Sequence, residues 1–211
     1  MSDGLVLYTN PQSRGRIVRW MLEELGQPYR TEVVGYGPPM KSPEYLAINP
    51  MGKVPAIKHG DTVVTECAAI CTYLADAFPD AGLMPPAGSP ARGEFFRWMF
   101  FAAGPLEQAV VNTSFGFEVP VDGQGRAGYG TYDLVMDTLD AHFKTHDFAL
   151  GDAFSAVDVY LGSHIMFGMM FGGVEKRPSF EAYCGRLTAR PALRKASEID
   201  DKLAEEAKSG G

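Results

Sequence analysis

Apolar residues recur along the first part of the chain with two different periods. The segments LVLYT, residues 5–9, and YRTEVV, residues 29–34, have the length and composition of short strands. Between them, apolar residues at helical spacing form one stripe: Ile17, Val18, Met21, Leu22 and Leu25. Ser13 is the predicted N-cap of this helix, and Gly26 is its predicted end. Strand, helix and strand within the first 34 residues predict a βαβ unit with parallel strands.

A second group of elements follows between residues 43 and 78. PEYLAINP, residues 43–50, predicts a helical turn that ends before Pro50, because the residue before a proline is pushed out of the α region. VPAIK and TVV predict two strands joined at HGD, a tight turn in which Gly60 takes a positive φ. Residues 66–78 return to helical spacing. The first 80 residues therefore predict β-α-β, an irregular crossover and β-β-α.

The segment PDAGLMPPAGSP, residues 79–90, ends this pattern. It holds four prolines and two glycines, which is typical of a domain boundary. Beyond it the spacing predicts helices only, near residues 91–111, 129–146, 155–171, 179–190 and 191–208. Ser155 and Asp158 have the spacing of a helix capping box, which we assign to structure and not to catalysis. We predict two domains, an α/β domain over residues 1–80 and an all-helical domain over residues 88–211.

Composition and charge narrow the classes of function. With 211 residues, of which 45% are hydrophobic, the chain is long enough to bury real cores. Its net charge is −7 and it has no dense run of Lys or Arg, which argues against nucleic acid as a partner. Its apolar runs are broken before membrane-spanning length, so we expect no membrane partner. The first residues lack a signal-peptide pattern and the three cysteines are an odd number, which together predict a reduced, cytoplasmic setting.

Two short motifs in the first domain carry the candidate chemistry. A cis bond at Val54-Pro55 would turn the chain sharply and leave the N–H and C=O of Val54 facing outward, where an extended peptide could pair with them. Glu66 and Cys67 stand where a helix begins, and the free N–H groups and positive dipole end of a helix bind a carboxylate. From these residues alone, an ordinary strand edge and an ordinary helix start are equally compatible with both motifs.

The motifs together resemble those of the cytosolic glutathione transferases. LYTNPQSRGRIVRWMLEELG, NPMGKVPAI, TECAAI with YLAD, and FSAVDVYLGS occur in the family's order and span nearly the whole chain. The combination is specific, whereas each segment alone would be weak. The resemblance implies a thioredoxin-like α/β N-terminal domain, an all-α C-terminal domain and glutathione as co-substrate.

The resemblance also implies a role for each residue of the two motifs. Val54, followed by a cis Pro55, would pair with the cysteinyl backbone of glutathione, and Lys53 would lie near its glycyl carboxylate. Glu66 would hold the γ-glutamyl ammonium and Cys67 the γ-glutamyl carboxylate. Cys67 departs from the family's usual Glu-Ser, and we expect weaker binding because a thiol is a poorer donor than a hydroxyl. The helix start would also favour the thiolate of Cys67, which makes it a candidate for a mixed disulfide with glutathione.

The implied reaction is attack of the glutathione thiolate on an electrophile, which requires the protein to favour the thiolate over the thiol. A hydroxyl at the start of the first helix would do so by hydrogen bonding and through the helix dipole. Ser13 is the predicted donor, and Arg14 beside it adds positive potential. Tyr8, Thr9 and Asn10 stay open as alternatives, and Ser13 could also serve only as a helix cap.

The helical part offers a second substrate site and a dimer contact. EFFRWMFF, residues 94–101, is apolar at six of eight positions, more than one buried helix face needs, so a homodimer contact or a substrate wall both fit. MFGMMFGG, residues 166–173, suits a permissive apolar pocket, and Phe117 and Phe167 are candidate pocket residues. No CxxC pair occupies the first helix and no histidines cluster, so neither a dithiol oxidoreductase nor a metal site is expected.

The leading hypothesis is therefore an enzyme that conjugates glutathione to small hydrophobic electrophiles. Glutathione-dependent reduction, isomerisation or dehalogenation on the same site is one alternative. A non-catalytic, glutathione-binding regulatory protein is the other.

Overall fold

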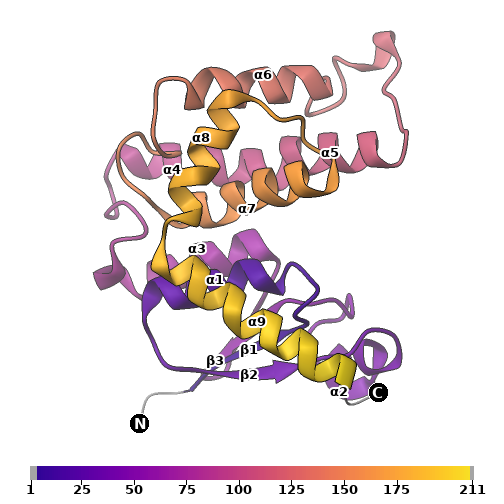
Figure 1. Ribbon diagram of the computed structural model, residues 1–211, viewed down its shortest axis with the longest axis vertical. Helices are drawn as coiled ribbons and strands as arrows, with labels where there is room; N and C mark the ends of the chain where they lie inside the picture. Colours follow the sequence, from indigo (N-terminus) through magenta and orange to yellow (C-terminus); the bar gives the residue numbers. More distant parts are fainter. Residues whose placement is uncertain (1–3, 210–211) are drawn as a thin grey trace. The chain divides into compact units, whose positions relative to one another are not determined.

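The structure, a computed structural model, describes residues 4–209. Their helices and strands group into two compact units (Figure 1). The first comprises the chain up to Ala81 together with the segment from Ala189 onward, and the second runs from Gly82 to Thr188. The division into domains at residues 1–80 and 88–211 stays a prediction. By its contacts, the segment from Ala189 onward groups with the first unit.

The first unit is built on a four-stranded sheet of order β2-β1-β3-β4. Its elements in chain order are β1 Leu5–Thr9, α1 Gly15–Leu25, β2 Tyr29–Val33, η1 Pro38–Lys41, α2 Pro43–Leu46, β3 Ala56–His59, β4 Thr62–Thr65, α3 Cys67–Ala77, η2 Pro79–Ala81 and α9 Pro191–Ser209. β1 pairs parallel with β2 and antiparallel with β3, which in turn pairs antiparallel with β4. Gly60, in the turn between β3 and β4, has a φ of 59°. The order confirms the predicted β-α-β and β-β-α halves and the thioredoxin-like fold.

Successive side chains of β1 point to opposite faces of the sheet, and different helices cover the two faces. Thr9 points toward α1, since a Cβ added to Gly15 would lie 1.9 Å from the Thr9 Oγ1. Tyr8 therefore points to the opposite face, where its ring centroid lies 6.2 Å from that of Tyr45 in α2. α1 packs against α3, and the apolar stripe predicted for α1 is buried.

Helix α9 packs along α1 through charged contacts. The Arg19 side chain of α1 is 1% exposed and donates its Nε to Oδ1 of the fully buried Asp200 at 2.8 Å. Arg19 also donates to the hydroxyls of Tyr29 and Thr31, each at 3.1 Å. Further ion pairs join the same two helices or their flanks: Arg16 with Asp201, Lys195 with Glu23, and Arg190 with Glu24. Because a buried charge without its partner is strongly destabilising, the Arg19–Asp200 pair favours one register of α9 on α1.

The second unit is built from helices, as predicted. They are α4 Ala91–Phe101, α5 Glu107–Ser114, α6 Tyr132–Phe143, α7 Ala156–Phe171 and α8 Pro178–Thr188. The helix predicted over residues 91–111 is interrupted by η3, a π-helical turn over Ala102–Leu106 that contains Pro105. A proline cannot donate an N–H to the helix ladder, and the wider turn accommodates it. The connection between α5 and α6 contains the short η4, Val121–Gly123.

The predicted capping box at the start of α7 is confirmed and belongs to a wider buried network. Ser155 Oγ accepts the N–H of Val157 at 3.3 Å, and Asp158 Oδ2 accepts the N–H of Ser155 at 2.8 Å. Asp158 Oδ1 accepts the N–H of Ala149 at 2.7 Å and the hydroxyl of Tyr183 at 2.9 Å. Burial raises the pKa of Asp158, and these donors oppose the rise. The carboxylate thus satisfies buried donors of the helical unit, which is a structural role.

We expect Asp158→Ala to lower the free energy of unfolding by about 3 kcal/mol, because each buried donor left without an acceptor costs about 1–3 kcal/mol. Urea denaturation followed by circular dichroism measures the change. Asp152→Ala, which removes an exposed carboxylate from the same loop, is the control and should unfold like the wild type. A loss below about 1 kcal/mol in Asp158→Ala would contradict the structural role.

Candidate functional site

Three of the predicted site segments meet at one edge of the sheet. In the sheet register, Ala56 at the start of β3 lies opposite both Tyr8, near the end of β1, and Thr65, the last residue of β4. β1 and β4 therefore end beside the start of β3. The turn that follows β1, the segment that precedes β3 and the start of α3 after β4 are gathered at this edge.

Ser13 lies in the turn between β1 and α1, where its hydroxyl is engaged. Ser13 Oγ donates to the Asn10 carbonyl at 2.7 Å and accepts the N–H of Gly15 at 2.9 Å. The helix begins at Gly15 with Arg14 as its N-cap, so the prediction that Ser13 is the N-cap is wrong by one residue. The reason is that the N–H groups of Arg16 and Ile17 bond three residues back, to the carbonyls of Ser13 and Arg14, at 3.2 Å and 3.0 Å, so a tighter turn precedes the α-helix. To donate to a ligand, the Ser13 hydroxyl would turn away from Asn10 and could keep the bond from Gly15.

Two of the alternatives to Ser13, Asn10 and Thr9, are occupied by structural contacts. Asn10 is buried, its Nδ2 donates to the Val34 carbonyl at 3.1 Å, and its Oδ1 accepts the N–H of Gln12 at 3.0 Å. Thr9 is fully buried and fills the space beside the start of α1. Ser13 is half-buried. Its hydroxyl is therefore the more accessible group at the start of the first helix.

The segment before β3 presents its backbone at the same edge. The Val54-Pro55 peptide bond is cis, as predicted. Upstream of it, the Lys53 carbonyl accepts hydrogen bonds from the Tyr45 hydroxyl and the Asn49 side-chain amide, each at 2.7 Å. Burial raises the pKa of Tyr45 to about 12, so its hydroxyl stays a donor. Among residues 4–209, none hydrogen-bonds to the N–H or C=O of Val54, and the Lys53 side chain is exposed.

Sequence reasoning missed the residues that support this segment. Lys41 Nζ donates to the carbonyls of Met51 and Gly52, at 3.0 Å and 3.1 Å. Gly52 has a φ of 58°, and a Cβ there would lie 2.6 Å from the Met40 carbonyl. Asn-Pro-x-Gly is a composition typical of turns, but a lysine that binds backbone carbonyls leaves no pattern in the sequence.

Glu66 and Cys67 open α3, as predicted, and differ in how they face solvent. Glu66 is exposed and holds a φ of 66° with a ψ of 121°. A positive φ in a residue with a Cβ costs about 1–3 kcal/mol and persists where the surroundings impose it, often at ligand sites. Cys67 is 9% exposed, and its Sγ donates to the Arg14 carbonyl at 3.7 Å. The Cys67 thiol thus bridges the starts of α3 and α1, a geometry that does not favour the mixed disulfide, which stays a prediction.

The edge therefore combines two helix starts, a half-buried hydroxyl, an exposed carboxylate and an unpaired strand-like backbone. Free N–H groups at helix starts attract anions, and the Cys67–Arg14 contact brings the starts of α1 and α3 together. Within residues 4–209, no group of three or more His, Cys, Asp or Glu side chains is arranged to hold a metal ion. No helix in the described part of the chain is long and apolar enough to cross a membrane.

Comparison with known proteins shows what this chain is similar to. Residues 13–77, a range that holds every predicted glutathione-site residue, match the sequence model of the glutathione S-transferase N-terminal domain. A glutathione S-transferase of Xanthomonas campestris is 29% identical over 160 residues, which cover 74% of this chain and 78% of that protein. A solved glutathione S-transferase from Xylella fastidiosa superposes with a TM-score of 0.77 at 27% identity, covering 93% of this chain and 98% of that one. These matches support a place in the glutathione S-transferase family.

A second solved member is a sphingomonad glutathione S-transferase complexed with glutathione. It is 25% identical to this chain, with a TM-score of 0.75, and the match covers 93% of this chain and 98% of that one. The coverage extends over both units of this transferase, so the resemblance is not confined to the thioredoxin-like part.

We expect Glu66→Gly to raise the free energy of unfolding of this transferase by about 1 kcal/mol, because glycine adopts a positive φ without the steric cost. The greater freedom of glycine in the unfolded chain offsets part of the gain. Glu66→Gln keeps the Cβ and should unfold within about 0.5 kcal/mol of the wild type. Urea denaturation of the three proteins measures both, and a destabilised Glu66→Gly variant would show that the positive φ carries no strain.

Proposed function

We propose that this transferase binds glutathione at the sheet edge and transfers its thiolate to small hydrophobic electrophiles. It is an enzyme that uses glutathione as co-substrate. The observation that supports this assignment is the register of the sheet, which brings the segments that carry Val54, Ser13 and Glu66 to one edge. The bound glutathione in the sphingomonad relative supports the choice of ligand.

Glutathione offers a complementary group for each part of the edge. Its cysteinyl backbone pairs with the N–H and C=O of Val54 as a short added strand. The N–H groups at the start of α3 attract its γ-glutamyl carboxylate, and Glu66 attracts the neighbouring ammonium. At the other end, its glycyl carboxylate lies near the exposed ammonium of Lys53. Cys67 contributes a backbone N–H, because its thiol is turned to the Arg14 carbonyl.

Activation of the thiol is assigned to Ser13. A free thiol of this type has a pKa near ~8.5 and is mostly protonated at neutral pH. The Ser13 hydroxyl donates to the sulfur, and the N–H of Gly15 polarises that hydroxyl while the dipole of α1 favours negative charge. The thiol proton passes to solvent. The thiolate then forms a C–S bond to the electrophilic carbon, and the leaving group departs with its electron pair.

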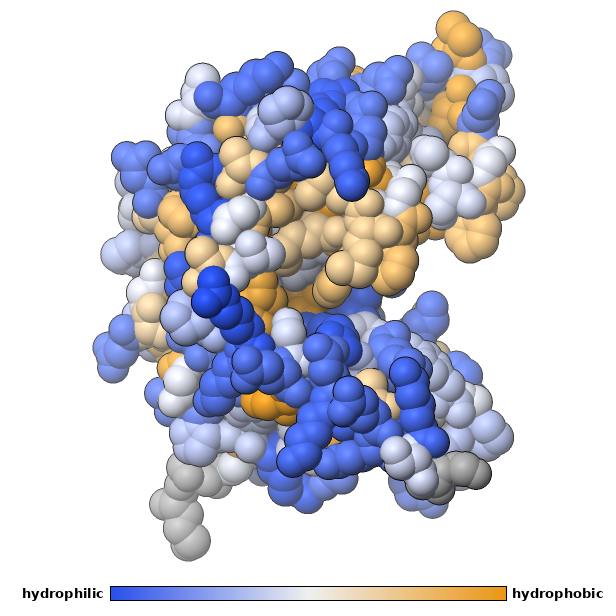
Figure 2. All heavy atoms as spheres, viewed as in Figure 1, coloured by the Kyte–Doolittle hydropathy of each residue, from blue (hydrophilic) through white to orange (hydrophobic). Residues whose placement is uncertain are grey.

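The helical unit supports an apolar second substrate. Exposed apolar side chains lie at the end of α5, in the connection after it and at the end of α7: Phe115, Phe117, Val121, Met170 and Phe171. Figure 2 shows apolar side chains gathered on this part of the unit. Phe117 is exposed and Phe167 is half-buried, and both are retained as candidate contacts for the electrophile.

Assembly and location complete the proposed function. On α4, Phe96 and Phe100 remain exposed although Phe95, Trp98 and Met99 of the same helix are buried. A helix with a second apolar face supports a homodimer contact. We also infer a cytoplasmic location, which fits the three free cysteines.

Replacing Ser13 with Ala should lower kcat with an aromatic halide electrophile about 100-fold, because removing one donor to a developing anion costs about 10²–10³ in rate. Glutathione affinity, measured by calorimetry on the same samples, should change little. Ser114→Ala is the control, since that hydroxyl also donates to a backbone carbonyl but lies on α5. Unaffected turnover in Ser13→Ala would direct the search to Tyr8→Phe and Asn10→Ala.

Replacing Glu66 with Gln should weaken glutathione binding about tenfold, because it removes a charge-assisted hydrogen bond to the ammonium. Lys53→Met should weaken binding by only a few-fold, roughly the value of an exposed ion pair. Calorimetry measures both, and neither change should alter kcat at saturating glutathione. Wild-type protein that binds no glutathione would overturn the proposed function. Binding with activity only toward disulfides or peroxides would indicate a reductase, and binding without any turnover would indicate a regulatory protein.

A further inference from the structure

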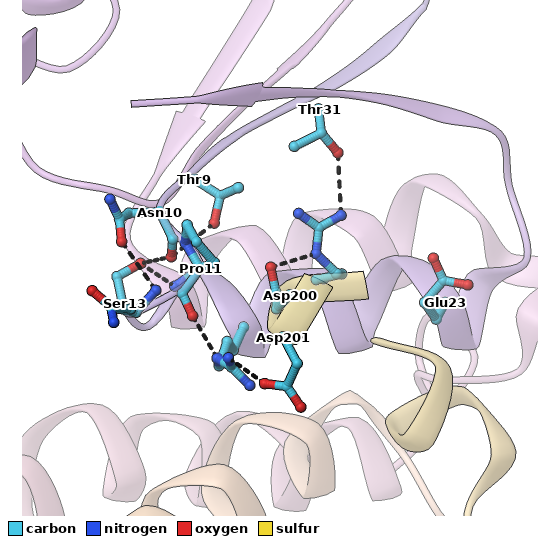
Figure 3. A network of polar contacts seen from close by, with 12 residues as sticks. Thr9, Asn10, Pro11, Ser13, Glu23, Thr31, Asp200 and Asp201 are labelled. Carbon is cyan, nitrogen blue, oxygen red and sulfur yellow. Dashed lines mark hydrogen bonds and ion pairs between the residues drawn. The ribbon is translucent and has the colours of Figure 1, made fainter. Parts of the chain in front are cut away.

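The turn that carries Ser13 is tied to α9 through one arginine (Figure 3). Arg16, in the first turn of α1, donates its Nε to the Pro11 carbonyl at 2.5 Å. The same guanidinium donates its Nη2 to Asp201 Oδ1 of α9 at 2.7 Å. The Arg16 side chain is 27% exposed and that of Asp201 is 62% exposed. A single side chain therefore connects α9 to the turn before α1.

The Pro11 carbonyl is one of three points at which residues outside this turn hold it. A proline has no N–H, so its carbonyl is the one backbone group through which the residue can hydrogen-bond. On its N-terminal side, Asn10 is tied to the chain after β2 by its bond to the Val34 carbonyl. On the other side, the Gln12 carbonyl accepts the hydroxyl of Tyr36 at 3.0 Å. Arg16 supplies the contact between these two anchors.

The position of Asp201 is fixed by its neighbour. Asp200 is fully buried and accepts from Arg19, which lies three residues after Arg16 on the same face of α1. α9 cannot shift along α1 without breaking this buried pair. Asp201 therefore reaches Arg16 from a constrained backbone, which lowers the entropy lost when the exposed pair forms.

We propose that Arg16 and Asp201 are positioning residues for the thiol-activating hydroxyl. α9 orients Arg16, Arg16 holds the Pro11 carbonyl, and the turn aims the Ser13 hydroxyl at the sulfur. This inference rests on the proposed function. In the proposed binding mode, neither residue contacts glutathione. Their loss acts through the position of Ser13, where a displacement of about 1 Å can cost up to 10²-fold in rate.

The expected signature is a change in thiol activation with little change in glutathione binding. Arg16→Gln should lower kcat/KM at neutral pH about tenfold, the effect of losing a charge-assisted hydrogen bond. Asp201→Asn should lower it about two- to fivefold, the range for an exposed ion pair. In both variants the pH profile of kcat/KM should move to higher pH, because a misplaced hydroxyl favours the thiolate less. Asp201→Glu, which restores the carboxylate, should recover most of the loss.

Two matched variants separate positioning from general effects. Glu205→Gln removes one negative charge from an exposed site on the same helix and should leave the pH profile unchanged. Lys195→Gln breaks the Lys195–Glu23 pair, a 2.7 Å contact that joins α9 to α1 away from the turn. It should also leave the profile unchanged. A shift in Lys195→Gln as large as that in Asp201→Asn would overturn the inference and assign the effect to the docking of α9 as a whole.

Amide hydrogen exchange tests the same inference without turnover. The N–H of Ser13 bonds to the Asn10 carbonyl and that of Gly15 to Ser13 Oγ, so both report on the turn. Exchange at these two amides should be faster in Arg16→Gln and Asp201→Asn, and unchanged in the two control variants. If the wild type fails to turn over any electrophile, the proposed function is wrong. Hydrogen exchange still tests whether Arg16 and Asp201 hold the turn that carries Ser13. Unchanged exchange in Arg16→Gln would overturn the link whatever the activity.

Discussion

The central position of β1 is the constraint on which the rest of the first unit depends. A strand paired on both sides has its backbone groups occupied along its length, so the chain can only turn at its ends. Parallel pairing with β2 demands a crossover, which α1 provides, and antiparallel pairing with β3 brings the start of β3 to the end of β1. The site segments meet at one edge as a consequence of strand order alone, whatever side chains they carry.

Much of this arrangement could be predicted from the sequence, because the spacing of apolar residues indicates which face of each helix or strand is buried. The stripe of α1, the two strand pairs and the capping box at Asp158 follow directly from residue types and their intervals. The burial of Arg19 could not be foreseen, since a charged residue in an amphipathic helix is normally predicted to face solvent. Its partner Asp200 lies 181 residues away, and no local pattern links the two. For the same reason, the sequence predicted α9 as part of the helical domain, while its contacts lie on α1.

At the site, residue types were easier to predict than their hydrogen bonds. Glu66 at a helix start and the cis bond at Pro55 were expected from composition and family resemblance, and the structure has both. The Ser13 hydroxyl was expected to face a ligand, yet in the structure it bonds to the Asn10 carbonyl. Tyr45, Asn49 and Lys41 were missed because they bind carbonyl oxygens, which every residue carries. A side chain that recognises backbone has no partner that can be read from sequence.

The first unit is built from two separate stretches of the chain, and this affects the order in which its parts are synthesised. Translation finishes β1 through α3 first and then the whole helical unit, and only afterwards supplies α9. Until then Arg19 lacks its partner Asp200, and the face of α1 that α9 covers stays open to water. Domains tend to fold as they emerge from the ribosome. Here the buried Arg19–Asp200 pair can form only after residue 200 has been synthesised, so the packing of the N-terminal unit is completed after the helical unit has been made.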